Sequence, residues 1–151
     1  MKKKMCIFSF SAILFIIVGV IVYQSLMRTT FEENLKNKIG SVEDITHITI
    51  QTRDSKSNEF LWAKIEDPII IKNAIDDMRG ISLQRQFRRG TRELEVMMTV
   101  HTFSDSYYYN YDDEHFVNDG KDHKILSGSF IEVIDSLDLE FVDSDEFMGM
   151  D

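Results

Sequence analysis

The feature that most constrains the fold of this chain is the uncharged run at residues 5–23, which follows the basic start MKKK. As a helix, this run would span roughly 28 Å at about 1.5 Å per residue, close to the hydrocarbon thickness of a bilayer. The sequence therefore predicts a transmembrane anchor at 5–26 behind a cytoplasmic start at 1–4. A cleaved secretory signal is the alternative, although its apolar run is usually shorter and a small-residue cleavage site follows it.

The charges that flank this run predict its orientation. Three lysines precede it, whereas Arg28 is the only basic residue between the run and Glu32. The positive-inside rule then predicts a single-pass protein of the cell membrane, with a cytoplasmic N-terminus and the C-terminal domain outside. The only cysteine, Cys6, lies within the run, so we expect neither a disulfide nor thiol chemistry in the rest of the chain.

A short stalk helix is predicted at 27–40. Thr30 and Glu33 match the capping-box pattern of a helix start, and Phe31, Leu35 and Ile39 recur every four residues. This apolar stripe is expected to pack on the following domain or on the lipid surface. A self-association seam is the weaker alternative, because the stripe is short for a coiled coil.

The domain proper is predicted at 41–138, followed by an acidic tail at 139–151. Alternating apolar residues predict strands, and helix boundaries are predicted from Asp67-Pro68, Gly80 and a second capping box at Ser129. The expected order is ββαβββα, an α+β fold with an antiparallel sheet and helices on one face. The segments behind this order are strands at 46–52, 59–65, 94–101, 106–111 and 115–118, an optional strand at 121–126, and helices at 68–78 and 129–137.

An arginine-rich stretch supplies the main candidate binding site. Residues 79–92 contain five arginines and no carboxylate, in a chain with a net charge of −9. The four candidates are Arg85, Arg88, Arg89 and Arg92, because a guanidinium group grips carboxylates and phosphates through two parallel hydrogen bonds. Simple solvation of the charges is the competing interpretation.

The overall charge limits the partners of this site. All 26 acidic residues follow the apolar run, whereas three of the 17 basic residues precede it, so we expect no nucleic-acid binding. An acidic protein, a wall polymer or anionic head groups would suit the arginines. Self-association is a further option, because the acidic C-terminal part of one copy could meet the arginines of another.

The tyrosine-rich segment SYYYNY at 106–111 adds a second candidate. Side chains alternate along a strand, so Tyr107, Tyr109 and Tyr111 share one face and Tyr108 lies on the other. Burial of the first set with Tyr108 at the surface is one interpretation. The other makes Tyr108 part of a recognition surface, since tyrosine combines apolar area with a polar tip.

Catalytic and metal-binding patterns are absent from the sequence. No nucleophile motif, phosphate-binding loop or zinc-ligand spacing occurs, so no catalytic residue, metal or cofactor is predicted. The sequence favours a membrane-anchored extracytoplasmic binding module without catalysis. Two alternatives remain open: an immunity or inhibitor protein at the cell surface, and an extracytoplasmic hydrolase that uses the acidic turn at 112–122.

Overall fold

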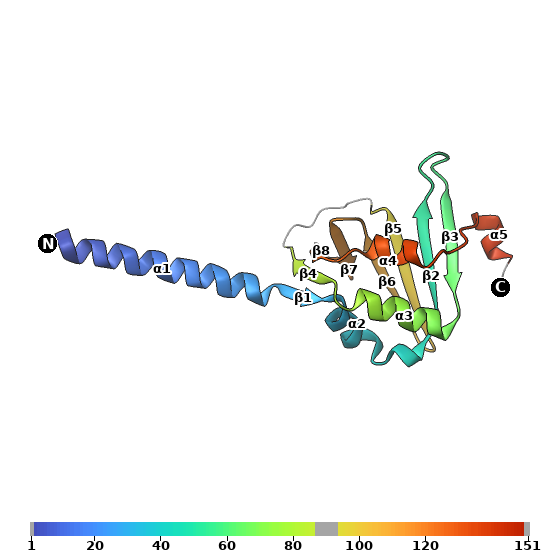
Figure 1. Ribbon diagram of the computed structural model, residues 1–151, viewed down its shortest axis with the longest axis horizontal. Coiled ribbons are helices and arrows are strands. Elements are labelled where there is room, and N and C mark those ends of the chain that lie inside the picture. The colour runs from blue at the N-terminus through green and yellow to red at the C-terminus, as the bar shows by residue number, and fades with distance from the viewer. Residues whose placement is uncertain (1, 87–93, 150–151) are drawn as a thin grey trace.

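The computed structural model describes the backbone of residues 2–86 and 94–149, and the side chains of residues 13–86 and 94–149. Within these ranges the protein has an α+β fold with an eight-stranded antiparallel sheet and five α-helices. The helices are α1 (Lys2–Leu26), α2 (Phe31–Ile39), α3 (Pro68–Met78), α4 (Phe130–Ser136) and α5 (Ser144–Met148), and a 3₁₀ turn, η1, spans Val42–Asp44. The first helix projects away from the folded domain (Figure 1).

The sheet has the strand order β1-β4-β8-β7-β6-β5-β2-β3. Strands β2, β5 and β6 pair over long registers, and the short strand β1 pairs with β4 at one edge. The strands are β1 (Arg28–Thr30), β2 (Ile45–Arg53), β3 (Phe60–Ile65), β4 (Ser82–Arg85), β5 (Val96–Thr102), β6 (Ser106–Tyr111), β7 (His115–Asn118) and β8 (Lys121–Ser127).

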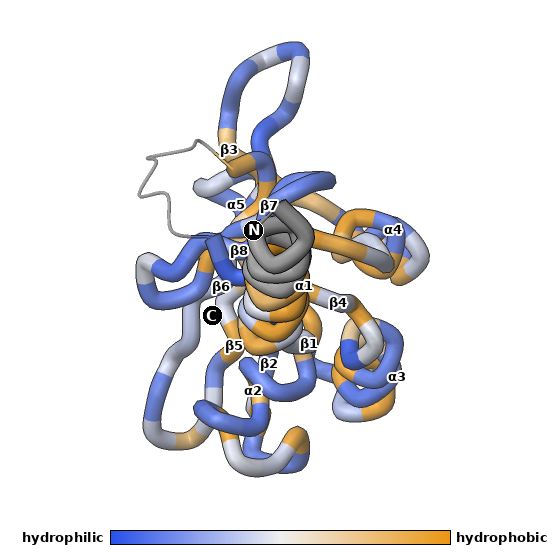
Figure 2. The backbone as a smooth tube through the Cα atoms, turned by 90° about the vertical axis from the view of Figure 1, so that its left-hand side faces the viewer, coloured by the Kyte–Doolittle hydropathy of each residue, from blue (hydrophilic) through white to orange (hydrophobic). Residues whose placement is uncertain are grey.

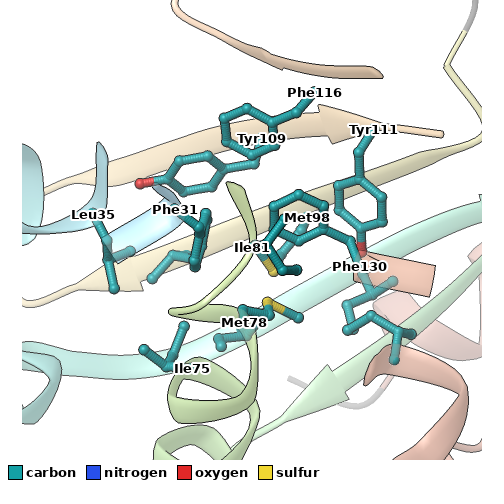
Figure 3. Packing of buried hydrophobic residues seen from close by; sticks show 14 of the residues in the cluster. Phe31, Leu35, Ile75, Met78, Ile81, Met98, Tyr109, Tyr111, Phe116 and Phe130 are labelled. Carbon is teal, nitrogen blue, oxygen red and sulfur yellow. The ribbon is translucent and has the colours of Figure 1, made fainter. Parts of the chain in front are cut away.

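One face of the sheet carries α2, α3, α4 and the core. Helices α3 and α4 lie side by side on this face (Figure 2). An aromatic cluster fills the space beneath them, and Phe31 of α2 makes edge-on contacts with the rings of Tyr109, Phe116 and Phe130 at centroid distances of 5.2–5.9 Å (Figure 3). The apolar stripe predicted for the stalk helix therefore packs into the core, where Phe31, Leu35 and Ile39 are all buried.

The predicted membrane anchor is corrected by the structure. Among the residues that the structure describes, no helix is long and apolar enough to cross a membrane. This finding overturns the single-span anchor at 5–26, the membrane as a partner, and the localisation in the cell membrane with the C-terminal domain outside.

The predicted order ββαβββα is also wrong. Strands β1 and β4, which pair with each other, are absent from that predicted order. Strand β8, predicted only as an optional strand, pairs with both β7 and β4. Strands of three and four residues carry too few alternating side chains to be recognised alone. Their pairing partners lie far away in the sequence, so only the folded sheet identifies them.

Candidate functional site

The face of the sheet opposite α2, α3 and α4, here called the open face, is a polar surface. Its central row runs across four strands in register, from Lys64 through Thr49 and Thr99 to Tyr108. The two threonines are buried, whereas Tyr108 is 56% exposed. Tyr109 and Tyr111 are fully buried on the helix side, because neighbouring residues of a strand point to opposite faces.

Two histidines lie next to this row on the open face. His47 of β2 and His101 of β5 are directly opposed, and their rings stack at a centroid distance of 4.1 Å and an interplanar angle of 9°. Hydroxyl groups surround both rings. Thr46 Oγ1 lies 3.1 Å from His47 Nδ1, Ser106 Oγ lies 2.8 Å from His101 Nδ1, and Thr49 Oγ1 lies 3.4 Å from His101 Nε2.

Burial against this polar layer lowers the pKa of His101. The charges of His47 and Lys64 act in the same direction, because each would repel an imidazolium ion. His101 is therefore neutral at pH 7. One of its ring nitrogens donates a hydrogen bond, and the other carries a lone pair that can accept a hydrogen bond or bind a cation.

An apolar groove lies on the helix side of the sheet. It lies between α2 and α3, has a volume of about 770 Å³, and is lined by Leu35, Ile39 and Ile71. Two exposed apolar side chains, Phe103 at 86% and Ile69 at 70%, line it as well. Ion pairs within each helix flank the groove, including Glu32 with Lys36 at 2.8 Å and Lys72 with Asp76 at 3.1 Å.

The structure separates the predicted site residues. Arg85 ends β4 and is exposed, and it shares the helix-side face of the sheet with the buried Leu83. Tyr108 projects from the opposite face, three strands away from β4. The other predicted residues, Arg88, Arg89 and Arg92, lie outside the described residues.

Topology also brings an acidic turn to the sheet end where the arginine-rich stretch begins. The turn between β6 and β7 contains Asp112, Asp113 and Glu114. Arg85, the last residue of β4, lies in one row of paired residues with Tyr111, the last residue of β6. That row runs Arg85, His123, Phe116, Tyr111 and Val96. Arg85 therefore has carboxylates of its own chain at the same end of the sheet.

Sequence reasoning missed the opposed histidines. It considered the four histidines only for local metal-ligand spacings, and His47 and His101 lie 54 positions apart in the sequence. Alternation places each on the polar face of its strand, but only the strand register places them opposite each other. In the part of the chain searched, no group of three or more histidine, cysteine or acidic side chains is arranged to hold a metal ion.

The chain was compared with family models, with curated proteins and with solved structures, and no match was found. The described residues form an α+β fold with an eight-stranded antiparallel sheet and five α-helices, and the open face of the sheet is polar.

Proposed function

We propose that the protein is a binding module without catalytic activity, which docks an acidic protein or polymer through the arginine-rich stretch that begins at Arg85. The observation that carries this proposal is the exposed position of Arg85 at the end of β4, where no ion pair joins it to any described carboxylate. Four arginines within residues 85–92 would offer several planar guanidinium groups to carboxylates or phosphates at once.

The carboxylates of the acidic turn, at the same end of the sheet as Arg85, would compete with an acidic partner. Asp112 already accepts hydrogen bonds from the backbone amides of Glu114 and His115, at 2.7 and 2.6 Å, and lies 3.4 Å from the His115 ring. Asp113 and Glu114 are exposed and remain able to neutralise nearby cations. An acidic partner must therefore compete with these carboxylates, which makes docking sensitive to salt.

The open face supplies a second contact area for the same class of function. Tyr108 is exposed beside the histidine pair, and tyrosine is enriched in interfaces because its ring gains apolar contact while its hydroxyl stays hydrogen bonded. Since Arg85 and Tyr108 lie on opposite faces, one small ligand cannot touch both. A large partner that wraps around the sheet edge could contact both residues.

The arrangement of potential catalytic groups also favours binding. Ser106 contacts His101, but the other ring nitrogen of His101 faces the hydroxyl of Thr49 instead of a carboxylate. A serine–histidine pair needs a third group that orients the imidazole and stabilises its charge. We therefore assign the open-face polar groups to binding.

The test of docking uses labelled poly-L-glutamate and polyphosphate as acidic probes in fluorescence anisotropy. We expect the parent chain to bind at low salt, and a variant with Arg85, Arg88, Arg89 and Arg92 changed to serine to bind roughly tenfold or more weakly. The control removes the same charge elsewhere, through serine at Lys56, Lys72, Lys121 and Lys124, all of which are exposed. Equal losses in both variants, or no binding by the parent chain, would reject the arginine stretch as a docking site.

A further inference from the structure

The opposed histidines of the open face have a geometry that nothing in the proposed docking function explains. Imidazole rings at directly opposed positions of neighbouring strands offer two nitrogen ligands without any backbone rearrangement. We propose that His47 and His101 form a binding site for a divalent transition-metal ion, with the Nε2 atoms as its two protein ligands.

The hydrogen bonds around Thr46 define the tautomer of His47. The Thr46 hydroxyl donates its single proton to the carbonyl oxygen of His101 at 3.1 Å. In its contact with His47 Nδ1, at 3.1 Å, the same oxygen must then act as the acceptor. The ring proton of neutral His47 consequently lies on Nδ1, so Nε2 carries the lone pair that a metal ion requires.

His101 has a matching environment. Ser106 Oγ lies 2.8 Å from Nδ1 and can accept the ring proton there, which leaves Nε2 as an acceptor facing the Thr49 hydroxyl at 3.4 Å. Metal-binding histidines commonly donate their second ring N–H to an oxygen atom that fixes the ring orientation. Thr46 and Ser106 accept the Nδ1–H of the two rings, which keeps the lone pair of each histidine on Nε2.

The chemistry of the ligands selects the class of metal. Imidazole nitrogen suits Zn²⁺, Cu²⁺ and Ni²⁺, with waters completing the coordination, whereas Ca²⁺ and Mg²⁺ prefer oxygen ligands. The rings lie nearly parallel, so each must rotate about its side-chain bonds before the two lone pairs converge on one ion. Lys64 lies beside the pair, and its charge is offset by Glu66 at 3.1 Å.

Isothermal titration of the untagged chain with ZnCl₂ at pH 7.5 tests the site, alongside His47→Gln, His101→Gln and the control His115→Gln. We expect one saturable site in the parent and the control, and a loss of roughly tenfold or more in affinity in each of the other two variants. Thr46→Val keeps both histidines but removes the acceptor for His47 Nδ1–H, so we expect it to weaken zinc binding as well.

A second measurement uses the parent chain alone, so its result does not depend on whether the variants fold. In the parent chain, zinc should shift the Nε2 resonances of His47 and His101 in ¹⁵N spectra of the imidazole side chains, and leave those of the buried His123 unchanged. Absence of saturable zinc binding by the parent would overturn the proposal. Zinc binding that survives both His47→Gln and His101→Gln would also overturn it, as would zinc binding that is lost only in His115→Gln.

Discussion

At the scale of single residues, the core contains polar atoms that lack hydrogen-bond partners. The hydroxyl groups of Tyr109 and Tyr111 and the Nδ1 atom of His123 are buried and make no hydrogen bond with any described residue. Burial raises the pKa of both tyrosines well above the usual value, so they stay neutral and serve as large apolar groups in the aromatic cluster. Each unpaired atom costs stability, because it loses its bonds to water.

His123 should make the stability of the protein depend on pH. Burial is the main cause of its lowered pKa, and the charge of Arg85 adds to the effect. The unfolded chain therefore binds more protons below about pH 6.5, so the free energy of unfolding should fall as the pH drops through this range and be fully restored above it. Urea denaturation between pH 5 and 7.5 should show a smaller decrease for His123→Phe than for the parent. Identical pH dependence in the two proteins would contradict this prediction.

At the scale of secondary structure, local capping signals place the helices that cover the sheet. Thr30 and Glu33 form the reciprocal hydrogen bonds of a capping box, at 3.2 and 3.3 Å. Asp67 Oδ1 accepts a hydrogen bond from the Ile69 amide at 2.7 Å, and Ser129 caps α4 in the same way. These side chains satisfy free amides at the helix starts, which is why the sequence pattern located them.

The link between β8 and α4 depends on a glycine. Gly128 has φ +81°, and a Cβ atom there would lie 2.9 Å from Ile81 Cγ1. Gly128→Ala should lower the free energy of unfolding by about 2–3 kcal/mol, because backbone strain and the clash with a buried side chain add together. Gly120→Ala is the matched control: its φ is +67° but no atom lies within 4 Å, so we expect a loss of only about 1 kcal/mol. Thermal and urea denaturation would measure both, and equal losses would exclude the close approach of Ile81 as a cause.

At the scale of the whole molecule, segments from the two ends of the domain cover the sheet edges. Strand β1 pairs with β4 at one edge. At the other, Val142 exchanges two backbone hydrogen bonds with Trp62 of β3, at 2.8 and 2.9 Å, and Phe147 of α5 stacks on the Trp62 ring at 5.4 Å. An exposed edge strand would offer unpaired amides to other chains.

Removal of the C-terminal segment should therefore expose β3. We expect a chain that ends at residue 138 to unfold more easily and to self-associate as its concentration rises, whereas a chain that ends at residue 149 should behave like the parent. Sedimentation velocity at several concentrations would measure this. A shortened chain that stays monomeric and equally stable would show that the Val142 pairing does not protect the edge.

Several features of the fold and the site follow from the sequence alone, because they depend on neighbours within a few residues. Helix starts at Thr30, Asp67 and Ser129 arise from side chains that bond to the next turn. The alternation that buries Tyr109 and leaves Tyr108 exposed follows from the period of two along a strand. The arginine-rich stretch and the net charge are likewise evident from composition.

Other features were decided only by the tertiary structure, because they depend on contacts between distant residues. The short strands β1 and β4 exist through their mutual pairing, and the stripe on α2 could be assigned to the core only once its partners, Phe116 and Phe130, lay beneath it. Strand register alone places His47 opposite His101. Local sequence determines which face a side chain occupies, whereas the packing of the whole chain determines which side chain it meets there.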